Sequence, residues 1–174
     1  MKVLLLIAAL CVSASWASGE DLRHTRLTTD LLERTYKVIE KADNDQDWDT
    51  ILAYLASNVI MTVSFPDNPN ITPIMFSKDT YAKYLDEISA QFKDVSSNYL
   101  ITGCTITDNG QSGIVTSTYR QKATLKDTGR TITSHGKQID HFTLINGFPK
   151  ATKIDVTIRS SEQDSNKAID SDKK

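Results

Sequence analysis

Cysteine is scarce in this sequence, because the 174 residues contain only Cys11 and Cys104. Cys11 lies in an N-terminal apolar run that we expect to be removed, which leaves Cys104 alone. A single cysteine cannot form an internal disulfide, so the stability of the domain must come from its hydrophobic core. We expect Cys104 to point inward among apolar residues with no histidine beside it, which indicates packing rather than nucleophilic chemistry.

Long hydrophobic runs are also missing. The most apolar stretch runs from Val3 to Val12, about half of the roughly 20 residues that a membrane-spanning helix needs. It follows Lys2 and precedes Ser15-Trp16-Ala17, which places small residues at the two positions that a signal peptidase selects. We therefore predict a cleaved signal peptide over residues 1–17 and a mature protein that is secreted or periplasmic, with no membrane span.

No excess of positive charge is present, since 20 lysines and arginines face 22 acidic residues and the net charge is −2. This balance argues against nucleic acid as a partner. The histidines number three, and His135 and His141 would lie about 20 Å apart on one predicted strand, too far to share a metal ion. We expect no metal site and no cofactor. Asn70-Ile71-Thr72 forms a glycosylation sequon, and whether Asn70 is modified stays open.

An acidic stretch from Asp43 to Asp49 invites a calcium interpretation. Its first acidic positions fit an EF-hand loop, but Trp48 occupies the place of the turn glycine and Tyr54 that of the bidentate glutamate. We therefore interpret the stretch as a solvated connection between two helices, with Asp47 as an N-cap.

Apolar periodicity separates the chain into a helical first part and a β-rich second part. We expect helices over about 29–42, from Asp47, and from Ser77 to about Phe92, with one strand over 58–65 before the third helix. Strands are then expected over 99–107, 113–125, 131–145 and 151–158, separated by turns such as Asp108-Asn109-Gly110-Gln111 and Asn146-Gly147. This order indicates an α+β domain over residues 28–159, after a flexible segment (18–27) and before a disordered polar tail (160–174).

Turn chemistry predicts the register of the sheet. A tight Asn109-Gly110 turn places Cys104 opposite Val115 and Leu100 opposite Tyr119, and the next loop places Val115 opposite Asp140 and Ser117 opposite Gln138. Cys104, Tyr119, Asp140 and Phe142 then share the inner face, whereas His135 and His141 lie on the outer face. A three-residue loop with a bulge at Gly147 is needed to bring Ile154, Val156 and Ile158 to the inner face.

Asp140 is the most informative residue, because a carboxylate on an apolar, helix-covered face is costly unless it is paired or protonated. Two interpretations stay open: a hydrated or bonded group near the open end of the sheet, or a pocket acid. The candidate pocket residues are Tyr119, Gln138, Asp140, Phe142 and Trp48. Asp140 and Tyr119 are the candidate catalytic residues.

The layout resembles the nuclear transport factor 2-like superfamily, close to its SnoaL-like and ketosteroid-isomerase-type domains. The residues that carry this resemblance are the stretch from Asp47 to Val59, Ser77-Lys78-Asp79, and the closing hairpin from Gly136 to Phe142 with Asn146-Gly147. The resemblance implies a cone-shaped curved antiparallel sheet wrapped around three N-terminal helices (cystatin-like / nuclear transport factor 2-like). It also implies an internal pocket and a homodimer.

Three functions stay open at this point. The sequence favours an exported domain that binds a small apolar ligand or a protein partner without catalysis, because no complete acid–base set is visible. The first alternative is an isomerase- or cyclase-type enzyme that uses Asp140 with Tyr119, as the resemblance implies. The second alternative is a dimeric inhibitor or immunity module that makes contacts through its outer threonine, lysine and histidine side chains.

Overall fold

The computed structural model describes residues 23–163, with side chains as far as residue 159. Within residues 23–163, three helices and six strands follow one another. The bounds are α1 (Thr29–Asp45), α2 (Trp48–Tyr54), β1 (Leu55–Ser64), β2 (Ile74–Phe76), α3 (Lys78–Gln91), β3 (Phe92–Ile106), β4 (Ser112–Leu125), β5 (Thr131–Ile145) and β6 (Phe148–Gln163). The predicted signal peptide lies outside the described residues, as does the tail beyond residue 163.

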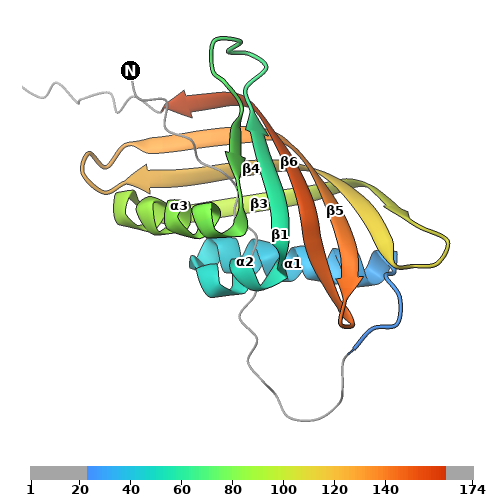
Figure 1. Ribbon diagram of the computed structural model, residues 1–174. Helices are drawn as coiled ribbons and strands as arrows, with labels where there is room; N and C mark the ends of the chain where they lie inside the picture. Colours follow the sequence, from blue (N-terminus) through green and yellow to red (C-terminus); the bar gives the residue numbers. More distant parts are fainter. Residues whose placement is uncertain (1–22, 164–174) are drawn as a thin grey trace, which may run out of the picture.

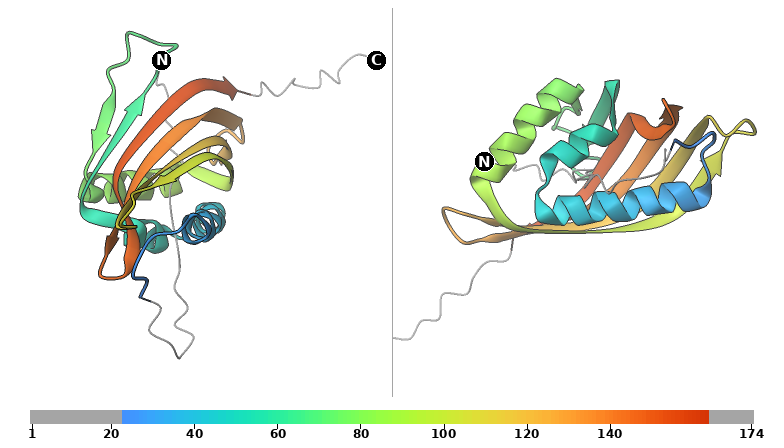
Figure 2. Two further views of the ribbon diagram at one scale, coloured as in Figure 1. Left: turned by 90° about the vertical axis from the view of Figure 1, so that its right-hand side faces the viewer. Right: turned by 90° about the horizontal axis from the view of Figure 1, so that it is seen from below.

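One curved sheet of six strands covers the helices in the order β2-β1-β6-β5-β4-β3 (Figure 1). The turned views in Figure 2 show all three helices on the concave side of the sheet. The α+β cone is therefore confirmed. The sheet is mixed rather than purely antiparallel, because β1 pairs with β6 in the parallel direction. Short β2, at the edge beside β1, was not among the strands expected from the sequence.

The helices begin where polar side chains cap them. Thr28 accepts a hydrogen bond from the amide of Leu31 at the start of α1, and Asp47 accepts one from Thr50 at the start of α2. Ser77 and Thr80 form a reciprocal capping box at the start of α3. The buried apolar faces of these helices pack with β1, β4, β5 and β6 into the main core. This core includes Leu32, Ile39, Ile51, Leu85, Val63, Phe142 and Ile154.

The predicted register is confirmed across the middle of the sheet. Val115 pairs with Asp140, Ser117 with Gln138 and Cys104 with Val115, as the turns indicated. Tyr119, however, pairs with Tyr99 rather than Leu100, because the register shifts between Ile101 and Gly103. This bulge turns Leu100 outward, and 64% of the residue is exposed. The expected position of Leu100 on the inner face was therefore wrong.

The last hairpin reaches the expected faces by a different route. Asn146 and Gly147, both with positive φ, form a two-residue turn, and Ile145 pairs directly with Phe148. The extra residue lies farther along β6, where the register shifts between the pairs His141–Lys153 and Phe142–Ala151. This bulge at Thr152, and not the predicted loop bulge at Gly147, returns Ile154, Val156 and Ile158 to the core.

The fold extends past the expected domain limits at both ends. Leu27 is fully buried, and its amide donates to the carbonyl of Gly110, so ordered packing begins before residue 28. At the other end β6 continues to Gln163, past the expected boundary at residue 159.

Helix α1 lies along the outer edge of β3. The amide of Ser97 donates to Asn44 Oδ1 (2.5 Å), and Asn44 Nδ2 donates to the carbonyl of Ser97 (3.1 Å). The amide of Tyr99 donates to Glu40 Oε2 (3.3 Å). Side chains of α1 thus form hydrogen bonds with backbone groups of β3 that no neighbouring strand pairs with.

Candidate functional site

Helix α1 directs two polar side chains toward the sheet. Tyr36 and Asp43 are seven residues apart, which places them on one face of the helix two turns from each other. Both are buried. Ile39, between them on the same face, is also buried, so the apolar stripe of α1 carries a hydroxyl at one point and a carboxylate at another.

Strands β4 and β5 supply the opposite wall. Alternate residues of a strand face the same side, so Ser117, Tyr119 and Gln121 of β4 point inward and are buried. Ser134, Gln138 and Asp140 of β5 do the same. The core of this cone therefore holds a stripe of polar side chains on its concave face.

Asp140 is the centre of a buried network. Tyr36 donates its phenolic hydrogen to Asp140 Oδ2, and Gln138 Nε2 lies 3.0 Å from Oδ1 and 2.9 Å from Oδ2. The two candidates from the sequence, Tyr119 and Asp140, are not hydrogen-bonded to each other. The tyrosine bonded to Asp140 is Tyr36, from a helix more than one hundred residues earlier, and Tyr36 was not among the candidate residues of the sequence analysis.

Burial is the largest influence on the pKa values of the Asp140 and Tyr36 side chains. Loss of water raises the pKa of Asp140 to about 7, although the hydrogen bonds from Tyr36 and Gln138 lower it and Asp155 raises it slightly. Burial and the neighbouring carboxylate raise the pKa of Tyr36 well above its ordinary value. Near neutral pH, Tyr36 is therefore a permanent donor, whereas Asp140 is divided between its charged and neutral forms.

Aromatic rings pack around the network. The ring centroids of Tyr36 and Phe142 are 6.3 Å apart, and those of Tyr36 and Tyr99 are 6.2 Å apart. Tyr99 in turn lies 6.3 Å from Tyr119. The predicted pocket residues Tyr119, Gln138, Asp140 and Phe142 are thus brought to one face, together with two tyrosines that were not among them.

A second buried carboxylate was missed by the sequence analysis. Asp43 was assigned to a solvated connection, but it is fully buried and accepts hydrogen bonds from Gln121 Nε2 (3.2 Å) and Tyr99 Oη (3.4 Å). Gln121 also donates to Ser97 Oγ (2.9 Å). The available signal was the spacing, because Asp43 follows Ile39 by four residues and therefore continues the apolar stripe.

Several buried polar atoms on the inner face have no hydrogen-bond partner within the described part of the chain. They include Tyr119 Oη, Ser134 Oγ and Gln138 Oε1, and also Ser117 Oγ and Gln121 Oε1. Ser134 and Gln138 flank Gly136 on β5, and Tyr119 is paired with Gly136 across the sheet. Tyr119, Ser134 and Gln138 therefore form one group, and the free energy cost of burying their unpaired oxygens is uncompensated.

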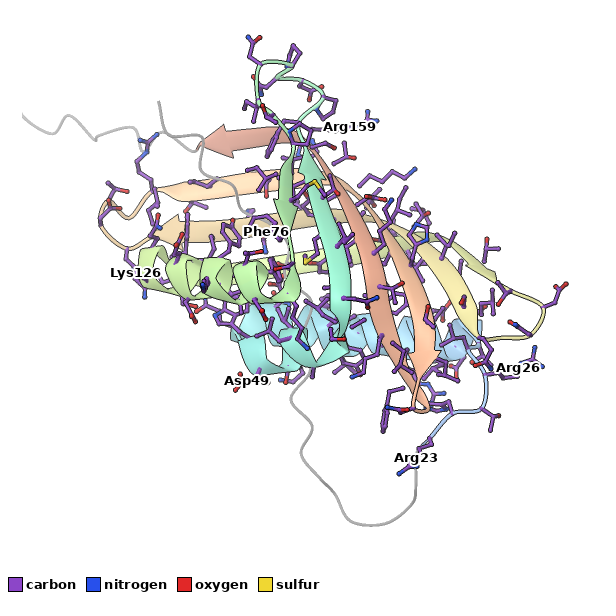
Figure 3. The ribbon with its side chains drawn as sticks, viewed as in Figure 1. Arg23, Arg26, Asp49, Phe76, Lys126 and Arg159 are labelled. Carbon is purple, nitrogen blue, oxygen red and sulfur yellow. The ribbon has the colours of Figure 1, made fainter. Side chains whose placement is uncertain are left out.

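Trp48 lies apart from this group. Its indole N–H donates to Ser89 Oγ, which joins α2 to α3, and its ring packs at the border of the two apolar clusters. Figure 3 shows how densely side chains fill the space between helices and sheet. The surface hollows beside His24, Lys126 and Lys41 do not include Asp140, which is fully buried.

The outer face carries the histidines, as expected. His135 is exposed and His141 half-buried, and they lie on β5 with the side chains opposite to Asp140. Among residues 23–159, no group of three potential metal ligands is close enough to hold an ion. No helix in the described range is long and apolar enough to cross a membrane.

Comparison with known proteins finds similarity of structure only. No protein-family model matches this sequence, and no curated protein matches it. A ketosteroid isomerase-like protein from Erwinia carotovora atroseptica superposes with a TM-score of 0.56 at 15% identity, over 77% of this chain and 99% of that chain.

Two further solved structures show the same likeness. An NTF-2 like protein of unknown function from Shewanella oneidensis has a TM-score of 0.58 at 16% identity, over 75% of this chain and 99% of that chain. LinA type 2, a hexachlorocyclohexane dehydrochlorinase, has a TM-score of 0.63 at 5% identity, over 79% and 88%. At such identities the likeness concerns the fold, which enzymes and proteins without a known activity share.

Proposed function

From the nuclear transport factor 2-like fold that this chain adopts, we propose that it is an exported domain that binds a small, largely apolar molecule without transforming it. The ligand carries an oxygen function that hydrogen-bonds to the inner face of β4 and β5. Aromatic rings around Tyr36 favour a flat or cyclic apolar body, because such rings contact it edge-on or by stacking.

The unpartnered atoms of Tyr119, Ser134 and Gln138 carry this proposal. Folded proteins leave few buried polar groups unpaired, and each exception calls for a bound water or ligand. Tyr119 and Ser134 are able to donate or accept, whereas Gln138 Oε1 accepts. A ligand hydroxyl on the inner face of β4 and β5 would complete all three, because it donates to Gln138 Oε1 and accepts from the Tyr119 and Ser134 hydroxyls.

Asp140 adds selectivity against charge. With a pKa raised to about 7 by burial, its neutral form is populated near physiological pH, and an anionic ligand beside it would oppose its ionisation. We therefore expect neutral ligands. Because Asp140 and Gln138 are fully buried, the helices must move relative to the sheet for a ligand to enter.

Native mass spectrometry of the protein purified from its source compartment tests this proposal. The expected result is a protein mass increased by a small organic molecule that is released by solvent extraction. A matched pair of variants localises it: Tyr119→Phe should lower the occupancy, whereas Lys83→Gln, on the exposed face of α3, should leave it unchanged. Protein that is free of ligand in every preparation, and that binds no neutral cyclic compound added at millimolar concentration, would falsify the proposal.

A second candidate function is proton-transfer catalysis of the isomerase type. The hydrogen bond between Tyr36 and Asp140 favours it, because a tyrosine and a neutral carboxylic acid stabilise a developing oxyanion. NMR measurement of deuterium exchange at the carbon beside the carbonyl of a cyclic ketone distinguishes this candidate from simple binding. Exchange that rises with the protein concentration and is lost in Asp140→Asn supports catalysis.

We also propose export and self-association. The apolar run and the small residues before Ser18 support removal of residues 1–17, and intact-mass measurement of secreted protein should give a chain that begins at Ser18.

Ile60, Met75 and Ile114 are exposed on the outer face of the sheet, which supports a homodimer through that face. An inhibitor or immunity role would use the same face and predicts a protein partner in place of the second copy.

A further inference from the structure

The outer face of the sheet carries a compact group of cations at one end. Exposed residues from three adjacent strands form it. The basic patch consists of Arg120 and Lys122 from β4, Lys137 from β5 and Arg159 from β6, with His135 beside them. Figure 3 places Arg159 on the side of the molecule away from α1 and α2. The patch therefore lies on the other side of the sheet from Asp140.

The register makes these residues neighbours. Arg120 pairs directly with His135, and Thr118, two residues before Arg120, pairs directly with Lys137. Paired strands lie about 4.8 Å apart and residues two apart on one strand lie about 6.7 Å apart. Arg159 occupies the bulge of β6 beside His135 and Gly136. Arg120 and Lys122 thus lie two residues apart along β4, and Lys137 lies diagonally across from Arg120 on β5.

The charge of the patch is not neutralised within the described residues. Arg120, Lys122, Lys137 and Arg159 take part in no salt bridge of residues 23–159, whereas Lys153, farther along the same face, pairs with Asp155. The whole chain has a net charge of −2. A local excess of cations on a chain that is acidic overall indicates a surface for an anionic partner.

We propose that the basic patch binds a sulfated polysaccharide. A convex, exposed face cannot enclose a small anion, so affinity must come from several weak contacts with one long chain. An arginine guanidinium group can donate two parallel hydrogen bonds to two oxygens of one sulfate group. Thr118 and Asn98, exposed beside Arg120, add hydrogen bonds to the sugar hydroxyls. An exported protein meets polysaccharides of this kind, and the proposal does not depend on the ligand in the cone.

Binding to a heparin oligosaccharide, measured by titration calorimetry at several salt concentrations, tests the proposal. We expect Arg120→Gln/Lys122→Gln to weaken binding at least tenfold and to reduce the slope of log Kd against log salt concentration by about two, one for each ion contact removed. The control Lys37→Gln/Lys83→Gln removes the same charge from α1 and α3 and should change Kd less than twofold. Thermal unfolding of both variants reports whether each is folded.

Three outcomes would overturn the proposal. Equal loss of affinity in both double variants would mean that net charge, and not the patch, attracts heparin. Binding of poly-glutamate as tightly as heparin would assign the patch to an acidic protein instead. Vesicles with one third anionic lipid that bind the protein at physiological salt, while heparin does not, would assign it to a membrane surface. Ligand-free protein remains a valid reagent here, so failure of the cone proposal leaves this test intact.

Discussion

The carboxylate of Asp140 is the most costly group in the core of this protein to bury in its charged form. A fully buried carboxylate loses its hydration, and the two donors Tyr36 and Gln138 replace only part of it. The residual cost appears as a pKa raised to about 7. The pocket interpretation of the sequence rested on this cost; full burial excludes a hydrated Asp140, and its role in a ligand pocket stays a prediction.

The stability of the protein should therefore fall as the pH rises through the acid range. Between about pH 4 and pH 7 the unfolded chain has lost the Asp140 proton and the folded chain still holds it, so unfolding becomes easier with rising pH. This group alone contributes a change on the order of 4 kcal/mol, from a pKa of 3.8 to about 7. Above pH 7 its contribution is constant. Urea unfolding at half-unit intervals of pH measures the profile.

Replacing Asp140 with asparagine should remove this contribution. The variant should be at least as stable as the parent at pH 8, because the Gln138 amide is able to turn its free oxygen toward the new amide hydrogens. Asp49→Asn, an exposed acid on α2, is the matched control and should keep the parental profile. A variant that is less stable than the parent at pH 8 but not at pH 5 would identify Asp140 as a well-paired charged group instead.

Two tyrosines on adjacent strands should respond in opposite ways to loss of a hydroxyl. Tyr99 donates to Asp43, so Tyr99→Phe should cost about 1–3 kcal/mol of unfolding free energy. The Tyr119 hydroxyl has no partner in the described residues, so Tyr119→Phe should leave the ligand-free protein equally stable or slightly more stable. Chemical unfolding of both variants checks this, and equal destabilisation would mean that Tyr119 already has a hydrogen-bond partner.

Among the strands, β5 contains a position that only glycine fits. A Cβ atom on Gly136 would lie 2.0 Å from the carbonyl oxygen of Thr157 on β6 and 2.9 Å from the Tyr119 hydroxyl. Gly136→Ala should therefore separate β5 from β6 and cost more than about 3 kcal/mol. Gly103→Ala, whose Cβ would meet only Thr116 at 3.9 Å, is the control and should be neutral. A urea midpoint for Gly136→Ala equal to that of the control would contradict this packing.

The strands also show how far the sequence could predict the fold. Turn chemistry and alternation predicted the pairs Val115–Asp140 and Ser117–Gln138 correctly. The bulges near Thr102 and Thr152 could not be predicted, because they depend on the curvature that the sheet acquires around the helices. For the same reason the contact of Tyr36 with Asp140 was missed: it depends on how α1 lies across β4 and β5, which strand register alone does not determine.

At the scale of the whole molecule, the outer sheet face divides into two regions. The basic patch occupies one end, and Ile60 and Ile114 lie at the other, in one row across the sheet with His141 and Lys153 between them. A dimer that buries the isoleucine end would leave the basic patch free on both copies. Self-association and polysaccharide binding are therefore compatible.

Dimer formation should depend on the isoleucine end alone. Light scattering coupled to size-exclusion chromatography should give twice the chain mass for the mature protein at micromolar concentration. Ile114→Lys, which places a charge at a side chain that is 40% exposed in the monomer, should shift the mass to that of one chain. Arg120→Gln should leave it doubled. A parent protein that is monomeric at all concentrations up to about 100 µM rules this interface out.

The hydrogen bonds between β3 and the side chains of Asn44 and Glu40 prevent further strands from adding to this edge of the sheet. An unpaired strand at the border of a sheet is a template onto which a further chain, folded or not, adds by backbone hydrogen bonding. Here α1 occupies the backbone donor and acceptor of Ser97 and the backbone donor of Tyr99, so a further strand cannot pair with β3 at these residues. Asn44 and Glu40 thus protect concentrated protein from fibril formation. Replacing them would show first as aggregation of stored protein, and not as a loss of ligand affinity.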